Sequence, residues 1–234
     1  MHSILRVSTF VLFTVSLLGA CAPAAQEREE ARVDVTPSGP AAYRPEAPGS
    51  QWTYLPDGAG LDEPRVRIEI EGPTVVGGAV LTAWHMEGRG LDVRWYRDHR
   101  EDGTYLVREE RPGTLISFDP PILEWTQEPM YVGMRWSGTT EATIRFPGAD
   151  AGRQPDQLSI EYAVEVVDRR DVRVAAGTFD VFVVNFTTLT RDEAGEVVET
   201  LTQETWVAPN LGEVRTENGF FLIGSNLLGA SSAP

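Results

Sequence analysis

Residues 159–166 read SIEYAVEV, and the alternation within this stretch decides the fold class. Large apolar side chains occupy every second position from Ile160 to Val166, and two glutamates and an alanine separate them. Because successive side chains of a strand point to opposite faces, this spacing predicts a strand with one dry face and one wet face.

The same two-residue period recurs along the chain, as in residues 66–71 (VRIEIE) and 198–206 (VETLTQETW). Turn sequences such as EDG at 101–103 and FPG at 146–148 separate the periodic segments. We expect strands, some of them merging, at about 51–55, 65–71, 79–88, 91–98, 104–110, 114–118, 122–126, 134–146, 158–168, 172–186, 196–207, 212–217 and 220–226. Many short strands joined by turns predict an all-β fold, a single antiparallel β-barrel-like or strongly curled sheet domain of about 10–12 strands.

The first 21 residues read as an export signal. Arg6 precedes an apolar run at 7–18, which is shorter than the ~20 residues that span a bilayer. The sequence LGAC that ends at Cys21 resembles the bacterial lipobox, and this resemblance implies cleavage between Ala20 and Cys21 and a lipid on the Cys21 thiol. The alternative is an ordinary secretory signal followed by a chance cysteine. Because the chain has a single cysteine, it forms no internal disulfide in either case.

The lipid would make the protein membrane-anchored, because about two or three acyl chains hold a protein stably on a bilayer. Ala22 follows the cysteine, and resemblance to the sorting signals of Gram-negative bacteria implies the outer membrane. We expect the domain to face the periplasm, with the cell surface as the alternative. The predicted organisation is a signal peptide at 1–20, a lipidated flexible tether at 21–49, a β-barrel-like domain at 50–227 and a disordered tail at 228–234.

The charge of the chain excludes one class of partner. The sequence has 35 acidic and 20 basic residues and a net charge of −15. An acidic chain repels phosphate backbones, so we expect no binding of nucleic acid.

Catalytic and metal-binding motifs are missing from the sequence. His85 and His99 have no cysteine or histidine at zinc-site spacing, and the chain has no GxSxG elbow and no phosphate-binding loop. The adjacent acids Glu109 and Glu110 could belong to a carboxylate pair, but so acidic a chain offers many such pairs on solvated strand faces. We therefore expect no metal, no cofactor and no catalytic residue.

Aromatic side chains are the more informative feature. They fall mostly inside the predicted strands, where inward-facing rings would fill the core or line a cavity. The candidates for core or cavity positions are Trp52, Tyr54, Trp84, Trp95, Trp136 and Trp206. We expect Trp206 to plug one end of the barrel, just before the turn at 209–212.

Four segments carry a family resemblance. They are GSQWTY at 49–54, VGMRW at 132–136, VAAGTFDV at 174–181 and ETWVAPNLGEV at 204–214. Their order resembles that of a broad group of uncharacterised bacterial envelope proteins, many of them lipoproteins with a domain of unknown function. The resemblance implies an antiparallel β-barrel-like fold and no particular activity.

Three functions fit these expectations. We favour a non-catalytic envelope module that binds an apolar or amphipathic ligand, a lipid for example, or that docks on an envelope protein. The first alternative is a structural or assembly protein that acts through its surface. The second, with the least support, is an envelope hydrolase. A continuous apolar cavity with few internal charges would favour the binding module.

Overall fold

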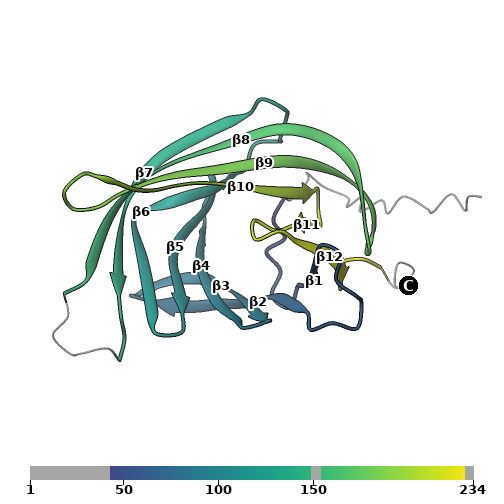
Figure 1. Cartoon of the computed structure of the whole chain (residues 1–234), viewed down its shortest axis with the longest axis horizontal. Helices are drawn as coiled ribbons and strands as arrows, with labels where there is room; N and C mark the ends of the chain where they lie inside the picture. Colours follow the sequence, from purple (N-terminus) through teal and green to yellow (C-terminus); the bar gives the residue numbers. More distant parts are fainter. Residues whose placement is uncertain (1–42, 149–153, 230–234) are drawn as a thin grey trace, which may run out of the picture.

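The computed structural model describes residues 43–148 and 154–229, and the regular structure in these ranges consists of twelve β-strands. Each strand pairs antiparallel with its sequence neighbours, and the first also pairs with the last, so the sheet closes into one barrel (Figure 1). The strands are β1 (Gln51–Pro56), β2 (Val66–Val76), β3 (Ala79–Gly88), β4 (Leu91–His99), β5 (Gly103–Arg111), β6 (Thr114–Thr126), β7 (Arg135–Arg145), β8 (Asp156–Val174), β9 (Gly177–Arg191), β10 (Val197–Ala208), β11 (Gly212–Arg215) and β12 (Phe220–Ser225). The predicted all-β fold class, strand number and antiparallel closure are confirmed.

The alternation in β8 separates the inside of the barrel from the outside, as its sequence predicts. Tyr162, Val164 and Val166 are buried, whereas Glu161 and Ala163 are exposed. Closure of the barrel gives β1 a partner strand on each side: Trp52 lies opposite Ile68 of β2 on one side and Ser225 of β12 on the other.

Several predicted strand boundaries are wrong; for example, β2 continues to Val76 instead of ending at 71, and β9 spans Gly177–Arg191 instead of 172–186. The predicted strands 114–118 and 122–126 form one strand, β6, which passes through Pro120 and Pro121. The pairing with β5 shifts register there, between Leu106 and Arg108, and prolines are tolerated where a strand bulges because no ladder hydrogen bond is required of them. Strand β8 likewise continues to Val174, beyond its predicted end at 168, and its pairing with β9 shifts register between Val166 and Asp168.

Residues 43–49, which we expected within the tether, pack into the barrel. The Tyr43 hydroxyl accepts a hydrogen bond from the Met130 backbone N–H at 3.1 Å, and its ring meets Phe182 edge-on. The Gly49 N–H donates a hydrogen bond to the Ile70 carbonyl at 2.8 Å, and this bond continues the pairing with β2 beyond the start of β1. The folded unit therefore begins by residue 43.

The far end of the domain differs less from the expectation. Leu227 and Leu228 still pack against the core, so the ordered part passes the predicted boundary at 227 by at least one residue. The predicted signal peptide, Ala20, Cys21 and residues 230–234 of the tail lie outside the described residues. In the part of the chain that is described, no helix has the length and apolarity needed to cross a membrane.

Candidate functional site

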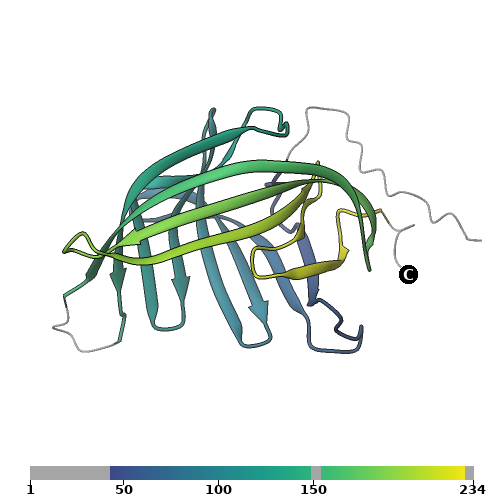
Figure 2. The same ribbon diagram turned by 45° about the horizontal axis from the view of Figure 1, so that its top comes forward.

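A cavity of about 460 Å³ lies inside the barrel. Members of both buried apolar clusters line it, among them Trp52, Trp84 and Met86 from one and Leu106 and Val184 from the other. Its lining also reaches the tips of the β3–β4 and β5–β6 hairpins, which lie side by side at one end of the barrel (Figure 2). This volume is within the range of pockets for small molecules.

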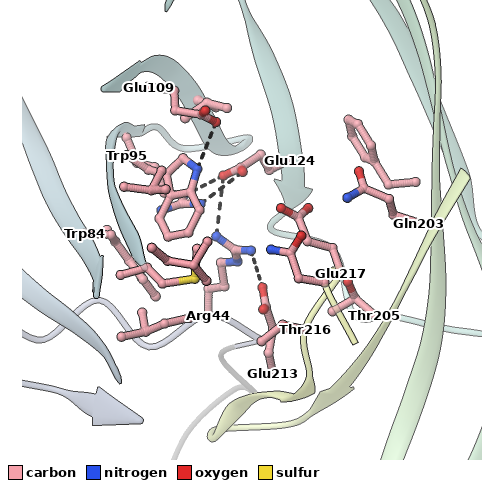
Figure 3. Close-up of a pocket in the computed structure, with 18 of the residues that line it drawn as sticks. Arg44, Trp84, Trp95, Glu109, Glu124, Gln203, Thr205, Glu213, Thr216 and Glu217 are labelled. Atoms are coloured by element: carbon pink, nitrogen blue, oxygen red, sulfur yellow. Dashed lines mark hydrogen bonds and ion pairs between the residues drawn. The ribbon is translucent and has the colours of Figure 1, made fainter. Parts of the chain in front are cut away.

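Two arginines stack on tryptophan rings at the wall of the cavity (Figure 3). The guanidinium carbon of Arg97 lies 4.9 Å from the Trp84 ring centroid and 5.2 Å from that of Trp95. Arg44 reaches in from the segment before β1 and lies 5.4 Å from the Trp84 ring and 5.2 Å from the Trp125 ring. Planar guanidinium groups stack well on aromatic faces, so the rings and cations stabilise one another.

Carboxylates neutralise both arginines. Arg97 donates from Nε and Nη2 to the two oxygens of Glu124, at 2.6 and 3.1 Å. Arg44 pairs with Glu213 and also lies 3.6 Å from Glu124. Burial alone would raise the pKa of the Glu124 carboxyl, but the attraction of Arg97 and Arg44 outweighs burial and lowers that pKa below its ordinary value.

A further carboxylate, Glu109 on β5, is fixed at the same wall. It accepts a hydrogen bond from Trp95 Nε1 at 3.2 Å and pairs with Arg111. Its neighbour Glu110 instead accepts from the Tyr96 hydroxyl at 2.8 Å in an exposed contact. The two adjacent acids therefore have separate partners and do not act together as a carboxylate pair.

The β11–β12 turn brings Glu217 into the cavity. Backbone hydrogen bonds join Thr216 to Phe220 and Gly219, and the Thr216 hydroxyl accepts from the Phe220 N–H at 3.2 Å. Glu217 lines the cavity, and its side chain is exposed to solvent. Figure 3 shows it between Arg44 and the β10 side chains Gln203 and Thr205.

The environment of Glu217 perturbs the pKa of its carboxyl group. Burial and, after it, repulsion from the carboxylates of Glu213 and Glu124 raise the pKa of Glu217 to about 7. At neutral pH this carboxyl is therefore divided between its neutral and charged forms. A chemical group that binds beside it can shift that balance.

Four of the six aromatic candidates from the sequence line the cavity: Trp52, Tyr54, Trp84 and Trp95. Trp52 stacks on Trp84 with centroids 5.4 Å apart, and its Nε1 donates to the Leu211 carbonyl at 2.6 Å. The Tyr54 hydroxyl donates to the Glu213 carbonyl at 3.0 Å. These bonds fasten β1 to the β10–β12 region across the barrel.

The other two aromatic candidates lie elsewhere. Trp136 packs against the apolar cluster that contains Leu106 and Val184, and its Nε1 donates a hydrogen bond to the Leu123 carbonyl at 3.0 Å. Trp206 does not plug the barrel end as we expected. The Trp206 side chain is half-buried, lies between Arg170 and Arg215, and meets Phe221 edge-on. The inward positions of this part of β10 are occupied by Gln203, Thr205 and Val207, which alternate with Trp206 along the strand. (Cys21 and Ala20 are not among the described residues.)

Sequence reasoning missed the charged half of the site, namely Arg44, Arg97, Glu124, Glu213 and Glu217. For Arg97 a signal was available, because the two-residue period in β4 places it on the same face as Val93 and Trp95. Arg44 lies in a polar segment without any period, so nothing in its surroundings indicates burial. The described residues contain no group of three or more His, Cys, Asp or Glu side chains that could hold a metal ion.

Comparisons with known proteins give distant similarities only. No family model matches the chain, and no curated protein matches it. One similar solved structure is that of a "putative lipoprotein" from Parabacteroides distasonis ATCC 8503, with 15% identity, a TM-score of 0.42 and coverage of 80% of this chain and 99% of that one. Another is a "putative exported protein with YmcC-like fold" from Bacteroides fragilis NCTC 9343, with 14% identity, a TM-score of 0.44 and the same coverage. Similarity at this level is too low to transfer a function.

Proposed function

We propose that this protein is a lipid-anchored envelope module that binds a small amphipathic ligand inside its barrel. The single observation that supports the proposal is the cavity of about 460 Å³, whose lining combines apolar side chains with charged and amide side chains. A wholly apolar ligand would leave the polar part of the wall without hydrogen-bond partners, and this costs free energy. An amphipathic ligand satisfies both parts.

The predicted lipid on Cys21 would hold this module on a membrane, in our proposal the outer membrane with the barrel in the periplasm. From the sequence we expect a binding module to have an apolar cavity with few internal charges, and this condition is not met, because Arg97, Glu124 and Glu217 are among the charged side chains that line the cavity. A wholly apolar ligand, which was one form of the binding hypothesis, is therefore disfavoured. Among the described residues, no specific observation favours either alternative, the surface-acting assembly protein or the hydrolase.

The test is a cavity-blocking variant with a matched control. Thr205 lines the cavity from β10, so Thr205→Trp would fill part of it, whereas Thr202→Trp adds the same ring to an exposed position of the same strand. We expect octanol, a small uncharged amphiphile, to bind the wild type and Thr202→Trp with equal affinity in isothermal titration and to bind Thr205→Trp at least about tenfold more weakly. Equal binding by all three proteins would contradict the proposal.

A further inference from the structure

Five carboxylates line the cavity, and four of them have a basic partner. The pairs are Asp92 with His85, Glu109 with Arg111, Glu124 with Arg97, and Glu213 with Arg44. Glu217 is the fifth, and within residues 43–148 and 154–229 it has neither a hydrogen bond nor an ion pair. The site therefore holds one carboxyl group in excess.

Stability of the fold does not explain this carboxyl group. Glu217 is exposed to solvent at the cavity, but the neighbouring carboxylates of Glu213 and Glu124 repel its charged form and make that form less favourable. The turn that carries it is nevertheless well ordered by the hydrogen bonds of Thr216, which hold Glu217 at the cavity. An unpaired charged side chain on a well-ordered turn is typical of a binding site, where the ligand supplies the missing partner.

The arginines of the cavity do not offer an equivalent site for an anion. Arg44 and Arg97 are each paired with a carboxylate and covered by two tryptophan rings, and Arg111 pairs with Glu109. Arg44 Nε and Arg97 Nη1 have no hydrogen-bond partner, but both atoms are closed off from solvent, so a ligand in the cavity does not reach them. A negatively charged head group would have to displace one of these carboxylates. A positively charged head group finds Glu217 free, in a chain whose net charge of −15 also attracts cations.

The surroundings of Glu217 suit a head group that donates hydrogen bonds. Asn218 of the same turn and Gln203 and Thr205 of β10 also line the cavity, and their oxygens accept hydrogen bonds. Apolar side chains that include Ile122 form other parts of the lining and would contact a hydrocarbon chain.

We propose that the cavity selects small amphiphiles whose head group is a protonated amine, and that Glu217 forms the ion pair with that amine. This inference rests on the proposed function, because it names the ligand class for the same cavity. Charge-assisted hydrogen bonds are the strong ones, so removing the carboxylate should weaken binding of the amine by about 10- to 100-fold.

The experiment compares three probes that share one hydrocarbon chain: octylamine, octanol and octanoate. Their affinities are measured at pH 8 by isothermal titration with the complete mature chain, residues 21–234, carrying Cys21→Ser so that no detergent competes for the cavity. The variants are Glu217→Gln and the control Glu193→Gln, which removes one charge at the exposed β9–β10 turn. Thr205→Trp reports whether binding occurs in the cavity.

We expect the wild type and Glu193→Gln to bind octylamine at least about tenfold more tightly than octanol, and octanoate most weakly. In Glu217→Gln the preference for the amine should vanish while octanol binds as before, and this also shows that the variant is folded. Equal affinity of the wild type for amine and alcohol, or an unchanged preference in Glu217→Gln, would overturn the inference and leave the proposed function standing. If none of the probes binds, or if Thr205→Trp binds all of them normally, the proposed function fails and the inference fails with it.

Discussion

Replacement of Glu124 by glutamine should destabilise the protein strongly, because Glu124 neutralises a guanidinium that has no access to water. Arg97 is 3% exposed and donates two hydrogen bonds to this carboxylate, at 2.6 and 3.1 Å. Removing one partner of a buried ion pair typically costs ~3–5 kcal/mol. Glu124 borders the cavity and its side chain is 15% exposed, so some water reaches it, and we expect a loss of about 3 kcal/mol in the free energy of unfolding.

The assay is urea unfolding followed by tryptophan fluorescence, since the rings of Trp84 and Trp95 flank Arg97. The control is Glu165→Gln, which breaks the exposed pair of Glu165 with Arg135 and should cost less than about 1 kcal/mol. The double replacement of Arg97 by Met and Glu124 by Leu should cost less than Glu124→Gln alone, because no unpaired charge remains. Equal losses in Glu124→Gln and Glu165→Gln would refute the reasoning, since the inner pair would then behave as a hydrated one.

Three further changes have defined outcomes. Trp206→Ala should lower the free energy of unfolding by about 1–2 kcal/mol because this ring is half-buried, whereas Trp52→Ala should lower it by ~3–5 kcal/mol because that ring is fully buried. Equal losses of the two variants in urea unfolding would contradict the outward placement of Trp206. The pKa of Glu217 is raised by folding to about 7, so its favourable contribution is complete below its ordinary pKa of 4.5 and is lost as the pH rises through 7. Glu217→Gln should therefore unfold at the same temperature as the wild type near pH 4 and at a higher temperature near pH 8, and a thermal midpoint that is lower at pH 8 would show that the carboxylate is stabilised there. Cys21→Ser should move the protein from the membrane fraction to the soluble fraction; sedimentation with the outer membrane would contradict the lipobox interpretation.

The fold could be predicted from the sequence because strand alternation is a local signal. Tyr162, Val164 and Val166 reveal their shared face without knowledge of any other strand, and closure of the barrel keeps that face buried. Strand boundaries were less predictable. Register shifts next to Val166 and Leu106 let single strands continue through sequences that resemble breaks, and such shifts depend on the partner strand.

The candidate site could be predicted only in its aromatic part. Trp84 and Trp95 fall on inward positions of recognisable strands, and so does Arg97, whose charge nevertheless suggests the surface. The burial of Arg97 depends on Glu124, 27 positions away, and that of Arg44 on Glu213, 169 positions away. The first pairing joins strands on either side of β5 and the second spans the closure of the barrel, and neither leaves a periodic trace in the sequence.

The seam between β1 and β12 would also set the order of events in the export that the N-terminal sequence predicts. Trp52 pairs with Ser225, and Arg44 and Tyr54 contact Glu213, so both the barrel and its cavity need the last residues of the domain. A chain that crosses a membrane from its N-terminus leaves β1 without its second neighbour until β12 has emerged. Contacts so distant in sequence form slowly, and an open sheet edge pairs readily with other chains. Protection of the β1 edge during the predicted export is therefore a requirement that this topology would place on the cell.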